Sequence, residues 1–464
     1  MSSQKFRKEK DSMGSMKVPK DAYYGAFTVR AHNNFNISGI TAPKAFRMAL
    51  GIVKFAAVKT NGKLGLIKKN YVQAIEKACQ EFIDGQFDPE FSLDVFQAGA
   101  GTSYNMNANE IIANRANEIL KGKKGEYKYV HPNNHVNIGQ STNDVIPTSS
   151  RVATLLCLPP LLEQIKELEK NFIKHSQKYK NLLKVGRTHL QDAVPITMGQ
   201  ELESYQQALE KSRNQIEKQS QDLTILGIGG TAVGTGINSH KNYKKTIVEN
   251  ISKITSIKFK SGKNLTEMAN NMNAFMNFSA SLRSLATNII NISHDLMLMN
   301  TGPKAGLSEI DLPPVQPGSS IMPGKINPSI CECALMIAFQ VLGNDKTIEA
   351  ACQRSHFELN VFCPIIMFNL VQSMEILTNG LKMLNQLCVK DMKINQNRIE
   401  ELFDNSLCTG TALAPKLGYI ETSDIIKAAL KKGKTIKQEV LDRKLLSKKE
   451  LDELLSPKNT TQPS

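Results

Sequence analysis

The apolar residues of this chain recur at helical spacing over long stretches. One stripe between Leu162 and Phe172 advances in steps of three and four residues. A second runs from Met268 to Met299 without an internal glycine or proline, and at about 1.5 Å per residue it predicts a helix of roughly 45 Å. A third apolar stretch covers 365–387. Successive long helices of this kind predict an all-α protein built around a helical bundle.

Polar, glycine-rich segments separate these stripes. Gly and Pro destabilise a helix interior by about 1 and 3 kcal/mol, so these segments are expected to interrupt the helices. They cover residues 97–110, 131–144, 185–195, 227–240 and 316–328. After about Asp391 the sequence becomes more charged. We therefore predict three domains: an N-terminal helical domain at 1–140, a central long-helix domain at 141–392 and a small C-terminal helical domain at 393–464.

Charge narrows the class of ligand. The chain carries 58 Lys and Arg against 43 Asp and Glu, a net charge of +15. A positive field attracts anionic substrates. The lysines are spread along the chain, tryptophan is absent, and no nucleic-acid-binding motif is present. We expect a small anionic substrate and no nucleic acid.

Hydropathy and cysteine usage bear on location. No apolar run reaches the ~18 residues that cross a bilayer, and the N-terminus has no apolar stretch typical of a secretory signal. We expect no membrane association and a cytoplasmic location. Most of the eight cysteines lie in apolar helical sequence, where reduced thiols act as small hydrophobes. Cys331 and Cys333 lack the spacing of a zinc ligand set and are predicted to be structural.

The histidine and glycine patterns predict neither a metal nor a cofactor. His131 and His135 are four residues apart, but Pro132 lies between them and no carboxylate set accompanies them. The segment 227–236 is rich in glycine, but it lacks the GxGxxG spacing after an apolar strand. We take the two histidines as structural and expect no metal and no nucleotide.

The segment 318–328 (GSSIMPGKINP) carries the clearest chemistry. It combines Ser319, Ser320, Lys325 and Asn327 in a frame of glycine and proline. Backbone N–H groups and a lysine in such a loop can converge on an anion. The sequence therefore predicts an anion-binding loop.

At this point the chain resembles the aspartase/fumarase superfamily, whose members eliminate a group from succinyl-type substrates to give fumarate. The loop at 318–328 is accompanied by four further segments that resemble superfamily motifs, in the same order. These are QAGAGTSYNMNANE, GQSTNDVIPT, GRTHLQDAVP and GGTAVGTGIN. The resemblance extends from Asp11 to about Leu455.

The resemblance implies a catalytic mechanism. Elimination starts with removal of a proton next to a carboxylate, and the dianionic aci-carboxylate that forms must be held by hydrogen-bond donors. The resemblance makes Ser319 the base, with Ser320 as the adjacent alternative, and Lys325 would help Ser319 to ionise. His189 would orient the leaving group or relay a proton. Glu332 would support His189.

The resemblance also implies how substrate is bound. Hydroxyl donors would hold the carboxylate that becomes the aci form, and these are Thr102, Ser141, Thr142 and Ser320. Ser103 is expected to bind substrate as well. Lys325 and Asn327 would bind the other carboxylate, while Asn143, Thr188 and His189 would contact the leaving group.

Structural alternatives exist for several of these residues. Thr102 and Ser103 follow Gly101 and would also suit a helix N-terminus, and Ser141 and Thr142 would suit a turn or cap. Arg187 and Asp192 are expected to form a structural ion pair with each other rather than to contact substrate.

The substrate is predicted to be a small dicarboxylate, and two readings compete. QAGAGTS, QSTND, DAYYG and GPKAGL resemble aspartases, where fumarases usually show GSGT and QSSND. KDSMG and HFELNVF resemble fumarases. The aspartase-like features lie in the site motifs, so release of ammonia from aspartate is favoured over release of water from malate.

An inactive structural or binding homologue is a third reading, disfavoured because Ser319, Lys325 and His189 are all present. The resemblance further implies a homotetramer with sites shared between subunits.

Overall fold

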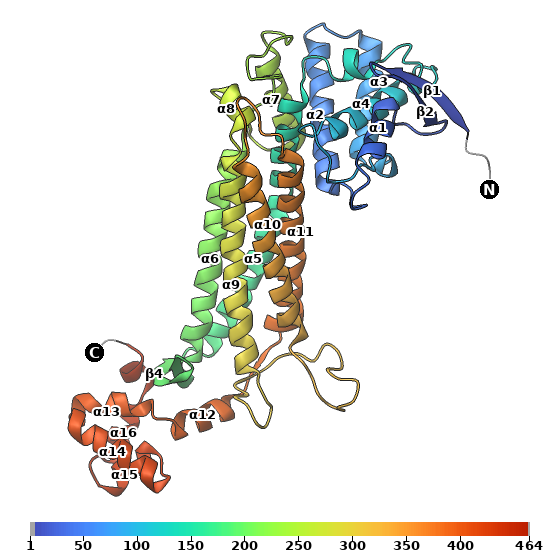
Figure 1. Cartoon of the computed structure of the whole chain (residues 1–464). Helices are drawn as coiled ribbons and strands as arrows, with labels where there is room; N and C mark the ends of the chain where they lie inside the picture. Colours follow the sequence, from blue (N-terminus) through green and yellow to red (C-terminus); the bar gives the residue numbers. More distant parts are fainter. Residues whose placement is uncertain (1–4, 463–464) are drawn as a thin grey trace. The chain divides into compact units, whose positions relative to one another are not determined.

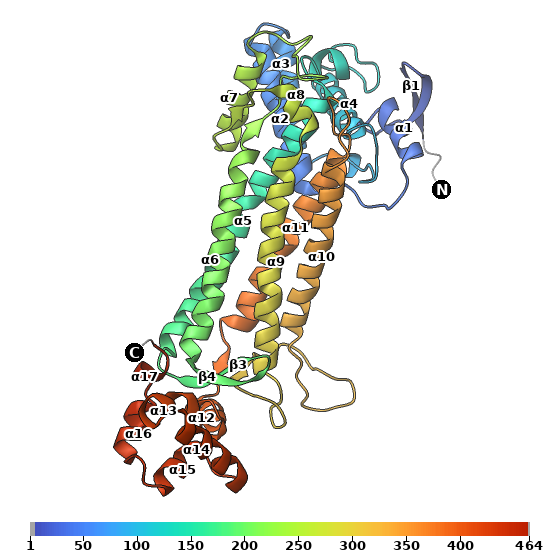
Figure 2. The same cartoon turned by 60° about the vertical axis from the view of Figure 1, so that its left-hand side comes forward.

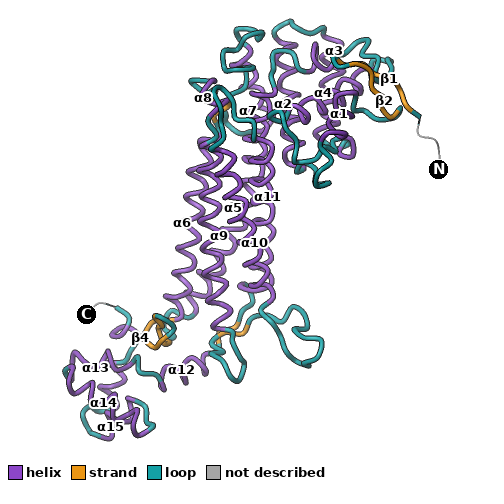
Figure 3. The backbone as a smooth tube through the Cα atoms, in the orientation of Figure 1, coloured by secondary structure: helices purple, strands orange, loops and turns teal. Residues whose placement is uncertain are grey.

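The computed structural model describes residues 5–462, and these are mostly helical, with a few short strands (Figure 3). The predicted all-α class is confirmed. The chain forms two compact units, each made of separate segments. Unit 1 contains Met1–Leu161, Asn214–Ser284 and Phe339–Leu377, and unit 2 contains Leu162–Arg213, Leu285–Ala338 and Thr378–Ser464. The division into three domains stays a prediction, and its outermost residues, 1–4 and 463–464, lie outside the described part.

Five long helices contribute to both units. They are α5 (Thr142–Lys178), α6 (Met198–Leu223), α9 (Asn273–Met299), α10 (Ser329–Cys352) and α11 (Cys363–Leu384) (Figure 1). In unit 1, the Ser279 hydroxyl of α9 donates to Asp345 of α10 at 2.7 Å. In unit 2, Arg213 of α6 pairs with Glu169 of α5 at 3.0 Å. The predicted apolar stripes are buried along these helices.

The stripe from Met268 to Met299 does not form one continuous helix, which corrects the prediction. A short helix, α8 (Leu265–Asn270), ends at Asn271, whose backbone is extended. The Asn271 side-chain oxygen accepts a hydrogen bond from the N–H of Asn273 at 2.8 Å, the first residue of α9. Asparagine competes with the helical backbone in this way, and it ends one helix and begins the next without a glycine or proline.

The rest of unit 1 consists of shorter elements around α2. Its helices are α1 (Ala26–Asn34), α2 (Lys44–Lys63), α3 (Lys69–Ile83), η1 (Asp88–Glu90), α4 (Thr102–Ile119), η2 (Pro132–Val136), α7 (Tyr243–Thr255) and α8. Its strands are β1 (Phe6–Asp11) with β2 (Gly14–Pro19), and β5 (Ile225–Leu226) with β6 (Lys260–Ser261). Helix α2 packs against α3, α4 and α7, and its buried face is apolar except for polar residues such as Lys54.

The rest of unit 2 consists of a hairpin and small helices. The hairpin is formed by β3 (Leu183–Thr188) and β4 (Gln191–Thr197). A separate pair of short strands is formed by β7 (Ile310–Asp311) and β8 (Lys393–Ile394). The helices are η3 (Asn385–Val389), α12 (Gln396–Asn405), α13 (Thr409–Leu417), α14 (Tyr419–Lys432), α15 (Ile436–Asp442), α16 (Lys448–Leu454) and α17 (Pro457–Thr460). The hairpin contacts α12 and α13 (Figure 2).

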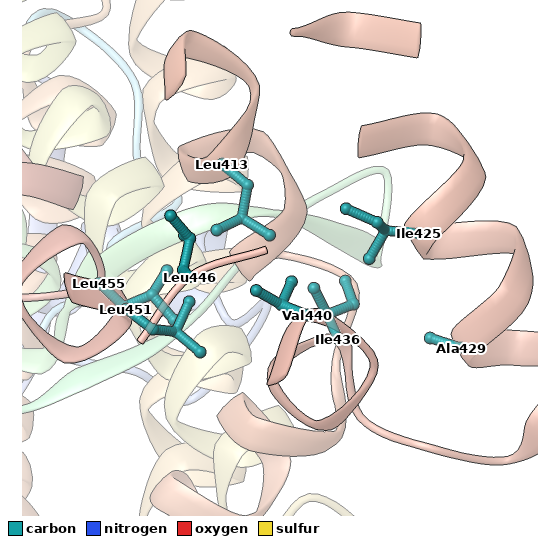
Figure 4. Packing of buried hydrophobic residues seen from close by; sticks show 8 residues of the cluster. All are labelled: Leu413, Ile425, Ala429, Ile436, Val440, Leu446, Leu451 and Leu455. Atoms are coloured by element: carbon teal, nitrogen blue, oxygen red, sulfur yellow. The ribbon is translucent and has the colours of Figure 1, made fainter. Parts of the chain in front are cut away.

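The C-terminal helices enclose an apolar core of their own (Figure 4). Its buried members are Leu413, Ile425, Ala429, Ile436, Val440, Leu446, Leu451 and Leu455. Thr435 and Ser447 form capping boxes that fix the starts of α15 and α16. The lysine-rich sequence therefore covers a folded helical cluster.

Helix α5 alone, among the described residues, is long and apolar enough to span a bilayer by length and composition. The qualifying window is 67% buried inside the protein, as expected for the core helix of a bundle.

Candidate active site

Thr102 and Ser103 begin α4 directly after a strained turn. Gly99, Ala100 and Gly101 all have positive φ, at 84°, 57° and 89°. Glycine adopts this left-handed backbone without a steric penalty. The Thr102 hydroxyl donates to the Gly99 carbonyl at 2.6 Å and makes no capping hydrogen bond. The alternative that the Thr102 side chain caps α4 is therefore wrong, and the hydroxyl lies at a helix N-terminus, where anions are favoured.

Ser141, Thr142 and Asn143 form the corresponding start of α5. The Ser141 side-chain oxygen accepts from the N–H of Asn143 at 3.3 Å, and the Ser141 N–H donates to Asp144 at 3.0 Å. The alternative that Ser141 caps a helix is therefore confirmed. Capping uses Ser141 Oγ as an acceptor, so its O–H can still donate to a ligand.

The two helix starts are joined by Asn105, which the sequence reasoning missed. Asn105 lies on α4, and its side-chain N–H₂ donates to the Thr142 hydroxyl at 3.2 Å. The segment 97–110 was expected to interrupt a helix, but it is helical from Thr102 onward, with buried asparagines facing polar partners. Asn143 donates to the Ala232 carbonyl at 2.8 Å, which brings the glycine-rich segment 227–236 to the same place.

A cavity of about 450 Å³ lies beside Thr102 and Ser103. Arg30 and Asp11 also line it and form a bidentate ion pair, with N···O distances of 2.6 and 3.0 Å. The hydrogen bond from Arg30 holds the pKa of Asp11 below its usual value. The sequence reasoning did not single out either residue, because their spacing of 19 positions gives no local signal.

Thr188 and His189 lie at the tip of the β3–β4 hairpin, where a loop was expected. His189 and Leu190 are the two turn residues, and both have positive φ, at 54° and 59°. Two-residue hairpin turns of this kind favour Asn and Gly, so His and Leu here store backbone strain. Both side chains are exposed. Strain of this kind is typical of functional turns.

A buried charge cluster anchors this hairpin. The Glu309 carboxylate is fully buried and pairs with Lys184 Nζ and Arg187 Nη1, each at 2.9 Å. Lys184 also pairs with Glu201. Arg187 therefore binds Glu309, and the predicted ion pair with Asp192 is wrong; Asp192 is its cross-strand neighbour only.

The loop at 318–328 folds back on itself. The Gly318 N–H donates to the Lys325 carbonyl at 2.8 Å, and the Asn327 side chain donates to the Gly318 carbonyl at 2.8 Å. Within this loop, Ser319 Oγ accepts hydrogen bonds from the N–H groups of Ile321 at 3.2 Å and Met322 at 3.1 Å. Two such donors favour the deprotonated oxygen over the hydroxyl.

Comparisons with known proteins identify the family. The Lyase family profile matches residues 14–343, and the profile of the fumarase C C-terminus matches residues 411–462. An aspartate ammonia-lyase of a Bacillus species is 42% identical over 98% of this chain and 98% of its own length. A class II fumarate hydratase of Brucella suis is also 42% identical, over 98% of this chain and 99% of its own. The chain belongs to the aspartase/fumarase superfamily.

Solved structures of superfamily proteins share the fold. A structure titled fumarate lyase:delta crystallin from Brucella melitensis, bound to cobalt, has a TM-score of 0.95 at 40% identity and covers 99% of this chain and 100% of its own. A class II fumarase from Schistosoma mansoni has a TM-score of 0.94 at 36% identity, with 98% of each chain covered. The chain is thus a superfamily lyase, while its relatives are named both as aspartate ammonia-lyases and as fumarate hydratases.

The predicted site residues of this lyase fall into two groups. Unit 1 carries Thr102, Ser103, Ser141, Thr142 and Asn143, and unit 2 carries Thr188, His189, Ser319, Ser320, Lys325, Asn327 and Glu332. Glu332 lies in the first turn of α10 and is exposed, with no hydrogen bond or ion pair to His189 within the described chain. Its support of His189 stays a prediction.

The residues set aside for structural roles have structural partners. His131 Nδ1 accepts from the N–H groups of Asn133 and Asn134, and His135 Nδ1 accepts from the N–H of His131. All eight cysteines are free thiols. Within residues 5–462, no three His, Cys, Asp or Glu side chains are grouped so as to hold a metal ion.

Proposed function

We propose that this lyase is an aspartate ammonia-lyase, which converts L-aspartate reversibly to fumarate and ammonia. The observation that carries the proposal is the environment of Ser319. Its side-chain oxygen receives two backbone N–H groups inside a loop that also carries Lys325. A serine held in this way has its negative charge compensated, which a serine base requires.

Proton removal would place a second negative charge on the substrate carboxylate beside the reacting carbon. Hydroxyl groups that already point at this carboxylate stabilise it most as the charge develops. We assign this role to Thr102, Ser141, Thr142 and Ser320. Lys325 and Asn327 bind the other carboxylate, although one Asn327 N–H is already used to close the loop. His189 and Thr188, with Asn143, contact the leaving amine.

The choice of aspartate over malate rests on where the aspartase-like residues lie. Ala100 belongs to the left-handed turn before Thr102, and Thr142 accepts the hydrogen bond from Asn105. Both positions adjoin residues assigned to the substrate carboxylate, so they bear on catalysis more directly than the fumarase-like HFELNVF loop at 356–362 does.

A class II fumarate hydratase is the second candidate, and one observation favours it. The fumarase-like KDSMG segment contributes Asp11, Ser12 and Met13 to the cavity beside Thr102. The support for this candidate lies in the resemblance of that lining segment to fumarases.

Separate assays with L-aspartate and L-malate decide between the two candidates. Fumarate absorbs in the ultraviolet and both substrates are almost transparent there, so its appearance reports elimination directly. We expect fumarate from aspartate, with ammonia released in equal amount. Fumarate from malate alone would establish the hydratase instead, and fumarate from neither would refute both.

We further propose a homotetramer in which each active site combines unit 1 residues and unit 2 residues from different copies. Several large apolar side chains near the site residues are exposed in the single chain. They include Leu190 at 73%, Ile321 at 83% and Met322 at 48%, and α10 adds Met336 at 63% and Phe339 at 53%. Exposed apolar surface of this extent favours assembly.

Light scattering during the activity assay tests the shared site. We expect a particle of about four chain masses, and loss of fumarate formation when dilution or mild urea dissociates it. A monomer with full activity would contradict the shared site, because its two residue groups would then have to act within one chain.

A further inference from the structure

Lys54 is a charged residue in the interior of unit 1. It lies on α2 and is only 1% exposed. Its Nζ donates to the Asn137 side-chain oxygen at 3.1 Å and to the Gln140 side-chain oxygen at 2.9 Å. It forms no ion pair with any described residue. A buried ammonium group without a carboxylate in contact is costly, so a role other than packing is expected for it.

The hydrogen bonds from Lys54 lead to a hydroxyl assigned to substrate binding. Asn137 Oδ1 also accepts from the side-chain N–H₂ groups of Asn105 and Asn109, each at 3.2 Å. The second N–H of Asn105 donates to the Thr142 hydroxyl oxygen at 3.2 Å. With that oxygen occupied as an acceptor, the Thr142 O–H is left to donate elsewhere.

Asp144 also restrains the start of α5, through hydrogen bonds from backbone N–H groups. Its carboxylate is 4% exposed and accepts the N–H groups of Ser141 at 3.0 Å, Gly229 at 3.0 Å and Thr231 at 2.9 Å. These bonds join the start of α5 to the glycine-rich segment 227–236. Lys54 and Asp144 are therefore both connected through hydrogen bonds to the residues that carry the hydroxyls.

The two charges compensate each other at a distance. Burial lowers the pKa of Lys54 to about 7, and the negative charge of Asp144 opposes this shift. Burial likewise raises the pKa of Asp144 to about 7, and the charge of Lys54 opposes that shift. The other titratable groups that act on this pair are Cys79 on α3 and Tyr243 on α7, and burial raises the pKa of each, which keeps both neutral.

We propose that Lys54 is a positioning residue which, held by Gln140 and acting through Asn137 and Asn105, keeps the Thr142 hydroxyl as a donor to the substrate carboxylate. This role rests on the proposed function, and it applies to aspartate and malate alike, because both present the same carboxylate. A hydroxyl donor binds that carboxylate more tightly as the carboxylate gains charge. Lys54 is therefore expected to stabilise the transition state more than the bound substrate.

The test is Lys54→Met, with Lys59→Met as the matched control on an exposed position of the same helix. Methionine keeps most of the side-chain length and removes the charge. This relieves the cost of burying the ammonium group, but the Asn137 and Gln140 side-chain oxygens each lose one donor and Asp144 loses the compensating charge. We expect kcat to fall about 100-fold with little change in KM, as for a small misplacement of donors. The fold should persist with a lower thermal midpoint, and Lys59→Met should match the wild type.

A second variant guards against misfolding of the first. Gln140→Met removes one acceptor of Lys54 at a half-buried position, and we expect the same selective loss of kcat at a smaller magnitude. Unchanged kcat in both variants overturns the proposal. So does a loss of activity in Lys54→Met that accompanies a lower thermal midpoint and is absent from Gln140→Met, because Lys54 would then be structural. A wild-type chain that converts neither substrate refutes the proposed function and this role with it.

Discussion

Ser319→Ala is expected to lower kcat by about 10⁴-fold, the upper range for loss of a general base. The hydroxyl oxygen is the only atom of this side chain that can take the proton, and alanine removes it without filling new space. KM should change little, because Ser319 is not among the groups assigned to bind the carboxylates. The measurement is fumarate absorbance under saturating aspartate, with malate as the parallel substrate.

The fold should survive this change. Among the residues that the structure describes, Ser319 Oγ accepts only from the N–H groups of Ile321 and Met322, both in an exposed loop where water can replace it. The expected loss is about 1 kcal/mol of stability or less. Ser320→Ala is the matched control, since it removes the neighbouring hydroxyl, and it should lower kcat far less. The reverse order of effects would transfer the role of base to Ser320.

Glu309→Gln is expected to lower the free energy of unfolding by about 3–5 kcal/mol, the range for removal of one partner from a buried ion pair. Glutamine has nearly the same shape, so packing is retained. The variant nevertheless leaves the buried Lys184 ammonium and the Arg187 guanidinium without their shared carboxylate. Glu201 remains for Lys184, but Arg187 has no other ion-pair partner in the described chain. The midpoint of urea unfolding, followed by circular dichroism, measures the change.

The matched control is Glu349→Gln, which neutralises one side of the exposed Lys346–Glu349 pair. Exposed pairs contribute about 0–1 kcal/mol, so its midpoint should stay close to that of the wild type. Glu309 anchors strand β3, which leads to Thr188 and to His189 in the turn. We therefore expect kcat/KM to fall in Glu309→Gln, while the control keeps its activity. Equal unfolding midpoints for the two variants would show that Glu309 does not anchor the hairpin.

The ends of the helices were the least predictable part of the fold. The stripe beginning at Leu162 identifies α5, but the helix starts 20 positions earlier, at Thr142, and continues through Pro147, Pro159 and Pro160. Proline opposes helix by local propensity, and the helix is stabilised instead by burial of the apolar residues that flank Pro159 and Pro160, such as Leu155 and Leu161. At Asn271 the opposite occurs, because a side-chain hydrogen bond ends a helix that the apolar period alone would continue.

The candidate site was predictable where its chemistry is local. Ser319, Lys325 and Asn327 stand within nine positions, and the loop closes on itself through their backbone and side-chain groups. Asn105, Glu309 and Lys54 were missed for a common reason. Each acts through partners distant in sequence, and an isolated Asn, Glu or Lys in a helix or strand is usually a surface residue.

The sequence by itself determined that the chain is helical, and it predicted that the chemistry resides in the polar segments between apolar stripes and that one of these segments binds an anion. These conclusions follow from hydrophobic period and from residue types that are neighbours along the chain. Only the tertiary structure decided which groups share the two helix starts, what anchors the strained turn at His189, and that a buried lysine leads to Thr142. Such contacts depend on how elements pack, and packing brings together side chains that no local pattern relates.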